Sequence, residues 1–200
     1  MTQTNATKIP LDPVHDLQRA FRKIVTALSF PGRLVNLAPE AQGIDLEFGL
    51  PSGLVLIAWM LLDTETSFYC AEAEASQSLA LLSFSRTKPI GEARFLFCDG
   101  RSPDFLELLN QAGNGNLIDP HESATIIAQC DFVAADPSFV LSGPGIEDST
   151  ICQIGLCPGW LEIRNQRNQE FPLGIDLILV DGANRAMALP RSTKIIPGGA

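Results

Sequence analysis

Residues 174–189 read GIDLILVDGANRAMAL, and this stretch decides the fold class. The almost continuous apolar run 175–180 lies between Gly174 and the Asp181-Gly182 turn, as a strand covered on both faces would. A second apolar run, 187–189, follows the turn 181–185 and is expected to pair beside the first. The stretch therefore predicts a buried strand with an antiparallel neighbour.

Helical and extended patterns alternate along the rest of the chain, which favours a layered α/β fold with a mixed sheet. The first helix follows Asp12-Pro13, presents Val14, Leu17, Phe21, Ile24 and Leu28 as its core face, and stops at Pro31-Gly32. Further helices are predicted over 53–62, 76–84, 104–111 and 158–167. Strands are predicted over 33–37, 46–50, 66–70, 94–98, 124–130 and 139–142. No repeat or linker divides the chain, so 1–200 is expected to be one domain, with a mobile N-terminus (1–11) and a tail (195–200).

The composition excludes two classes of protein. Hydrophobic residues make up 46% of the chain and charged residues 18%, so it is not a disordered chain. With 14 basic and 23 acidic residues the net charge is −9, which argues against a nucleic-acid binder. The charge is uneven: residues 1–33 carry +3, residues 34–150 carry −13 and residues 151–200 carry +1. One interpretation of this uneven charge is an acidic surface that keeps the protein soluble. The other is that any anionic ligand must be bound by the chain ends or by a partner.

The lack of a visible targeting signal and the spacing of the cysteines predict a soluble cytoplasmic protein. No secretory signal is visible at the N-terminus. The most apolar stretch, 54–62, is too short to cross a bilayer, so no membrane association is expected. Five irregularly spaced cysteines suit reduced thiols.

Two glycine-rich segments resemble catalytic or nucleotide motifs and fail on physical grounds. The segment 113–116, GNGN, lacks a glycine at position 118 and follows a predicted helix, so it predicts a loop rather than a dinucleotide site. The segment 155–159, GLCPG, would make Cys157 a nucleophile, but Pro158 has no N–H to stabilise an oxyanion. His15 and His121 both precede it, so a buried thiol is expected, with no catalytic residue.

Metal ligands are equally scarce. Cys152 and Cys157 are five positions apart, and no C-x-x-C pair accompanies them. His121-Glu122 resembles the start of an H-E-x-x-H motif, but the position of its second histidine is Thr125. No metal site is expected.

Two other segments are candidate ligand sites or interfaces. Ser142, Gly143 and Gly145 follow a predicted strand and could present backbone N–H groups to an anion, or simply turn the chain. Arg191, Ser192, Thr193 and Lys194 gather two cations and two hydroxyls, which suits phosphate or phosphonate oxygens, a solvated tail or an intersubunit contact. Together with Arg33, the cations of this second segment are the candidate contacts for an anionic ligand.

Seven blocks follow one another along the chain: Asp12-Pro13-Val14 through Ala20-Phe21-Arg22, Phe30-Pro31-Gly32, Leu61-Leu62-Asp63-Thr64-Glu65-Thr66, Glu122-Ser123-Ala124-Thr125, Leu141-Ser142-Gly143-Pro144-Gly145-Ile146, Phe171-Pro172-Leu173-Gly174-Ile175-Asp176 and Leu189-Pro190-Arg191-Ser192-Thr193. In this order they resemble the PhnH family, the H subunit of the bacterial carbon–phosphorus lyase system for phosphonate breakdown. One departure stands out: the segment 82–87, LSFSRT, lacks the arginine and histidine that family members often carry there, so no role of that histidine transfers to this chain.

The resemblance implies a three-layer α/β fold similar to the large domain of pyridoxal-phosphate-dependent transferases, but without the cofactor. A Schiff-base enzyme needs a positioned lysine, and none of Lys8, Lys23, Lys88 and Lys194 follows a strand in an obvious pocket, so pyridoxal phosphate is not expected.

The resemblance also implies a structural subunit of a complex that couples an alkylphosphonate to the ribose of ATP with release of adenine. Other carbon–phosphorus lyase subunits are the expected partners, and a homodimer is expected in their absence. The alternative is a stand-alone protein that binds a phosphonate or nucleotide, or a transferase, using Ser142–Gly145 and Arg191–Lys194.

Overall fold

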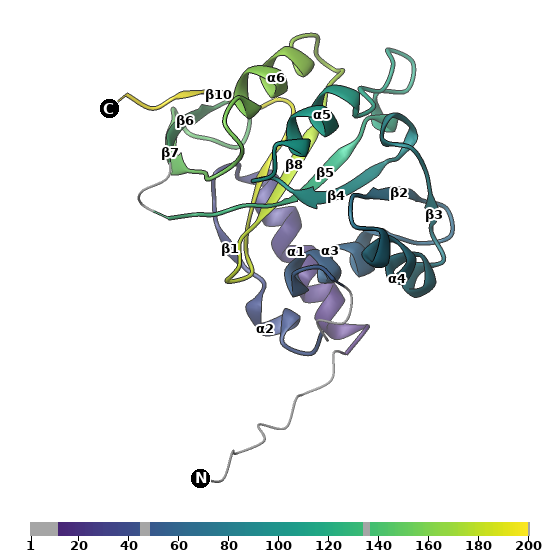
Figure 1. Cartoon of the computed structure of the whole chain (residues 1–200). Helices are drawn as coiled ribbons and strands as arrows, with labels where there is room; N and C mark the ends of the chain where they lie inside the picture. The colour runs from purple at the N-terminus through teal and green to yellow at the C-terminus, as the bar shows by residue number, and fades with distance from the viewer. Residues whose placement is uncertain (1–11, 45–48, 134–136, 200) are drawn as a thin grey trace, which may run out of the picture.

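A seven-stranded mixed sheet forms the centre of the protein in the computed structural model, which describes residues 12–44, 49–133 and 137–199 (Figure 1). The strand order is β1-β9-β8-β5-β4-β2-β3. Strands β3, β2, β4, β5 and β8 are parallel, whereas β9 is antiparallel to β8 and β1 to β9. The strands are β1 (Val35–Asn36), β2 (Ser67–Cys70), β3 (Arg86–Thr87), β4 (Phe95–Asp99), β5 (Thr125–Gln129), β8 (Asp176–Val180) and β9 (Arg185–Leu189).

Two apolar clusters cover the two faces of this sheet because successive side chains of a strand point to opposite faces. Leu177 and Leu179 of β8 face one cluster, and Ile178 and Val180 face the other. The first cluster includes helices α5 (Asp104–Gln111) and α6 (Trp160–Arg167). The second includes α1 (His15–Ser29), α2 (Ala38–Ala41), α3 (Ser52–Leu61) and α4 (Ala73–Ser83). The predicted layered α/β fold with a buried strand and antiparallel neighbour is confirmed.

A second, three-stranded antiparallel sheet lies on the α6 side of the molecule (Figure 1). Its order is β10 (Lys194–Pro197), β6 (Ser138–Ser142) and β7 (Thr150–Gln153). The predicted strand 139–142 is confirmed as β6, but the predicted tail 195–200 is wrong for residues up to Pro197. Ile195 is buried and pairs with Leu141, so this segment is ordered by the core.

Several element bounds differ from the predictions. The strand 33–37 shortens to β1, because Leu37 donates its N–H to the Asn184 carbonyl and α2 begins at the next residue. The helix predicted from residue 76 begins at Ala73. The strand over 46–50 falls largely on residues 45–48, which lie outside the described residues. The short strands β3 and β7 and the 3-10 turns η2 (Ile90–Glu92) and η3 (Pro120–Glu122) were not predicted.

The core face of the first helix differs in part from the prediction. Ile24 is buried as predicted, and Leu17 and Leu28 pack against the second cluster, whereas Val14 and Phe21 are exposed. The other buried positions of α1 are Ala20 and Ala27. Small alanines let the helix lie close to the sheet, and among the described residues Val14 and Phe21 remain exposed beside that face.

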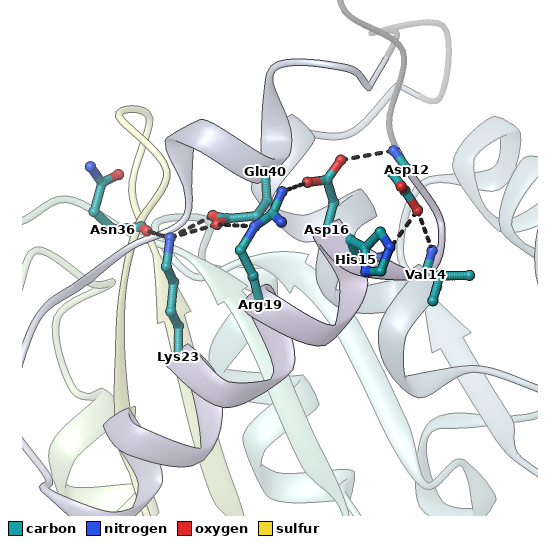
Figure 2. A network of polar contacts seen from close by, with 8 residues as sticks. All are labelled: Asp12, Val14, His15, Asp16, Arg19, Lys23, Asn36 and Glu40. Atoms are coloured by element: carbon teal, nitrogen blue, oxygen red, sulfur yellow. Dashed lines mark hydrogen bonds and ion pairs between the residues drawn. The ribbon is translucent and has the colours of Figure 1, made fainter.

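A buried carboxylate ties α1 to α2 and to β1 (Figure 2). Glu40 is 3% exposed, and both of its carboxylate oxygens accept hydrogen bonds from Lys23 Nζ at 2.8 and 2.6 Å. Lys23 Nζ also donates to the Asn36 carbonyl, and Arg19 Nε lies 3.6 Å from the Glu40 carboxylate. Two α1 cations therefore neutralise one charge beneath the helix.

Removing this ammonium group should destabilise the fold. In Lys23→Met the buried Glu40 carboxylate keeps only Arg19, so we expect the free energy of unfolding in urea to fall by about 3 kcal/mol. Lys88→Met, which removes an exposed pair with Glu92, is the matched control and should cost less than about 1 kcal/mol. Equal losses in the two variants would contradict a role for the buried pair.

Candidate ligand cavity beside the β9–β10 turn

The two candidate segments of the sequence lie side by side. Strands β6 and β10 pair with Ser142 opposite Lys194, and a Cβ atom added at Gly143 would lie 3.0 Å from the Ser192 carbonyl oxygen. The loop that follows β6 therefore contacts the turn that precedes β10. This neighbourhood was not predictable from sequence spacing, because about fifty residues separate the two segments.

Backbone contacts account for the two glycines of this loop. Gly143 has φ of 128° and Gly145 has φ of 83°, a region that side-chain-bearing residues rarely adopt. A Cβ atom at Gly145 would also lie 2.1 Å from the Ser29 carbonyl oxygen at the end of α1. These glycines are thus required by the close approach of loop, helix end and turn.

Arg191 is held by the fold itself. Its guanidinium forms an ion pair with the Asp176 carboxylate at the start of β8 and donates to the Pro120 and Pro172 carbonyls at 3.0 and 3.3 Å. The Arg191 backbone N–H donates to the same carboxylate at 2.6 Å. The charge and most of the donors that made Arg191 a candidate anion ligand are therefore used to fix the turn.

Arg164 of α6, which the sequence analysis did not single out, lies beneath the same turn. Its side chain is 1% exposed, and its two Nη atoms donate at 2.7 Å to the carbonyls of Pro190 and Thr193. Burial lowers the pKa of this guanidinium to about 10, although the Asp176 charge opposes that shift. The spacing of Trp160, Leu161 and Arg164 on one helix face was a signal that this arginine points inward.

A cavity of about 530 Å³ opens beside these groups. Its wall comes from α6 and the segment that follows it, from the β9–β10 turn and from the β6 loop. The lining residues carry three cations and no carboxylate: Pro144, Arg164, Asn165, Asn168, Gln169, Phe171, Arg191, Ser192, Thr193, Lys194 and Ile195.

Several polar groups of the cavity have no partner among the described residues. Arg164 Nε and Thr193 Oγ1 are buried without a hydrogen bond. Lys194 is exposed at the start of β10, and neither its ammonium group nor the Ser192 hydroxyl has a hydrogen bond or ion pair within the described ranges. The cavity therefore offers donors both at its base and at its rim.

Arg33 does not belong to this cavity. It lines a separate hollow of about 580 Å³ between the end of α1 and the loop 145–150, together with Glu147 and Asp148. Its guanidinium lies 5.8 Å from the centre of the Phe30 ring. Arg86, in the segment that departs from the family pattern, lies on β3, the edge strand of the large sheet.

The motifs rejected from sequence lie in unsuitable surroundings. The GNGN segment lines a hollow in which the carboxylates of Glu65, Glu92 and Glu122 accompany the cations Lys88 and Arg94, so the hollow has no excess of positive charge for a phosphate. Cys157 is buried, and its thiol donates to the Pro158 carbonyl at 3.8 Å. Within residues 12–44, 49–133 and 137–199, no cluster of His, Cys, Asp and Glu could hold a metal ion, and no helix is long and apolar enough to cross a membrane.

The fold and cavity define a mixed α/β protein with a cationic hollow beside its second sheet. Residues 10–196 match the family described as bacterial phosphonate metabolism protein (PhnH), and the chain belongs to this family. It is 35% identical over 188 residues to the putative C-P lyase subunit protein HtxG of Stutzerimonas stutzeri, covering 92% of this chain and 87% of that protein. It is 27% identical over 192 residues to the alpha-D-ribose 1-methylphosphonate 5-triphosphate synthase subunit PhnH of Rhizobium meliloti (strain 1021), covering 92% of each.

The cysteines should be unreactive in the folded protein. All five are buried, and burial raises the pKa of Cys70 and of Cys152 to about 11. A disulfide reagent at about pH 8 should therefore label less than one thiol per native chain within minutes and all five in denaturant. Rapid labelling of native Cys157 would reopen its candidacy as a nucleophile.

Replacing Arg164 should weaken the junction between the two sheets. Arg164→Met removes the donor to the Thr193 carbonyl and leaves the Pro190 carbonyl with the Thr193 N–H alone, so we expect a loss of about 3 kcal/mol in the free energy of unfolding and faster amide exchange in β10. Arg101→Met is the matched control, since Arg101 is partly exposed and pairs with Asp99 on the surface. A similar stability for both variants would show that the turn does not need the buried guanidinium.

Proposed function

We propose that this chain is a subunit of a carbon–phosphorus lyase assembly that breaks down organic phosphonates. With its partner subunits it would take part in coupling an alkylphosphonate to the ribose of ATP with release of adenine. The observation that carries the proposal is the match over residues 10–196 to the PhnH family, together with two relatives named as subunits of such systems.

Within that assembly we propose a supporting rather than a catalytic role. Cys157, the sequence's best candidate nucleophile, is buried, and the residue after it is a proline that cannot donate to an oxyanion. His121 lies on η3, and the thiol hydrogen bond of Cys157 goes to a backbone carbonyl. These placements support a chain whose contribution is made through its surfaces.

One such surface is an apolar stripe on α1 and its N-cap residue, which we define by Val14, Phe21 and Val25. These three residues lie on one side of the helix because they are seven and four positions apart. All are exposed, and Phe30 and Leu34 continue the exposed apolar surface beyond the helix. Exposed apolar residues gathered on one element mark an interaction site, and we propose that another subunit of the assembly covers this stripe.

Three further properties are proposed on the same basis. Helices on both faces of a mixed sheet support a likeness to the large domain of pyridoxal-phosphate-dependent transferases, without the cofactor. The exposed stripe supports a homodimer when other subunits are absent. The family's place in phosphonate metabolism supports a location in the cytoplasm.

Co-expression with the other subunits tests the proposal. A tagged full-length chain should retain them through purification, and Phe21→Glu should abolish that retention because it puts a charge into the covered stripe. Ile118→Glu, at an exposed apolar residue in the loop before η3, is the matched control and should keep the complex intact.

Thermal unfolding of both variants should match the wild type, since the altered side chains are exposed. A chain that never retains the other subunits would contradict the proposed function. Retention that survives Phe21→Glu would instead contradict the placement of the interface on α1.

A further inference from the structure

We propose that the cavity beside the β9–β10 turn binds the phosphoryl or phosphonyl oxyanion of a small organic molecule. The oxyanion would contact the Lys194 ammonium group, the Ser192 and Thr193 hydroxyls and the Arg164 guanidinium. A supporting subunit does not require such a ligand, so this inference goes beyond the proposed function and does not depend on it.

The charge of the lining is the first reason. In a chain with net charge −9, this cavity is lined by Arg164, Arg191 and Lys194 and by no acidic residue. Asp176 neutralises Arg191 directly. The hydrogen-bond partners of Arg164 are two carbonyls and the Asn165 side-chain oxygen, so none of them is charged.

The burial of Arg164 makes that imbalance costly. A guanidinium that is 1% exposed has lost most of its hydration, and carbonyl dipoles replace only part of it. A bound anion would offset this cost, and the attraction would be strong because the base of the cavity is shielded from water. The site therefore gains more from an anion than an exposed lysine cluster would.

Unused donors are the second reason. Arg164 Nε and Thr193 Oγ1 have no partner although both atoms are buried, and buried polar groups in folded proteins are nearly always hydrogen-bonded. Both residues line the cavity, as do Ser192 and Lys194. A tetrahedral oxyanion has enough acceptor oxygens to satisfy two hydroxyls, a guanidinium N–H and an ammonium group together.

The size and rim of the cavity indicate an organic ligand. About 530 Å³ is within the range of small-molecule sites and exceeds what a bare oxyanion needs. Phe171, which is 73% exposed, lines the cavity with Pro144 and Ile195 and offers apolar surface to a carbon-bearing group. Gln169 and Asn168 add polar contacts on the α6 side.

Calorimetric titration of the full-length chain tests the proposal with methylphosphonate, inorganic phosphate and ATP as separate probes. We expect binding of at least one probe, and the order of affinities identifies the source of the oxyanion. Lys194→Met and Ser192→Ala should each weaken that binding by about tenfold, because each removes a hydrogen bond to a charged group. Lys88→Met, which removes an exposed lysine from another hollow, should leave it unchanged.

Thr193→Val separates ligand binding from folding. Valine has a similar shape and removes a buried hydroxyl that has no partner, so the variant should be at least as heat-stable as the wild type and still bind the probe more weakly. The proposal is overturned if no probe binds at about 10 mM, or if Lys194→Met binds as the wild type does. Equal weakening by Lys88→Met and Lys194→Met would also overturn it, since it would indicate non-specific charge attraction.

Discussion

The hydrogen bonds from Arg164 to the carbonyls of Pro190 and Thr193 are the constraint on which the position of the three-stranded sheet depends. At this turn the chain leaves β9 of the large sheet and enters β10 of the small one. Backbone groups in a turn that packs against the core need partners. Here the Thr193 N–H donates to the Pro190 carbonyl, and Arg164 donates to the Pro190 and Thr193 carbonyls. A guanidinium, whose donors form a rigid planar fork, can serve two carbonyls at once.

The rest of the small sheet follows from that turn. Its position fixes the register of β10 against β6, which in turn brings the Gly143 loop against Ser192. The sheet then covers one apolar cluster, with Phe139 of β6 meeting Trp160 of α6 edge to face at 5.3 Å between ring centres. The residue that clamps the turn and the ring that supports the sheet thus come from the same helix, α6, so helix, turn and sheet form one unit around the cavity.

The elements that could be predicted from sequence are those with strong local patterns. The apolar runs of β8 and α3 are long enough to identify buried elements, and the turn 181–185 explains why β9 returns beside β8. Strands β3, β7 and β10 are too short to carry a period, and β10 has one buried residue, Ile195. The α1 prediction assigned Phe21 to the core, because residue size suggested burial where close packing required alanine.

The candidate site shows the same division between local and long-range information. The sequence singled out residues 142–145 and 191–194 as two candidate segments. Their contact depends on strand pairing between distant parts of the chain. The sequence could not reveal that Asp176 forms an ion pair with Arg191, because the two residues are fifteen positions apart.

Three cations close to the core form ion pairs with carboxylates of the same chain: Lys23 with Glu40, Arg185 with Asp181 and Arg191 with Asp176. Arg164 and the half-buried Arg167 differ, because their hydrogen bonds are with uncharged oxygens. Of these two, Arg164 lines the cavity, where an anion from outside the chain would supply the charge that the fold does not.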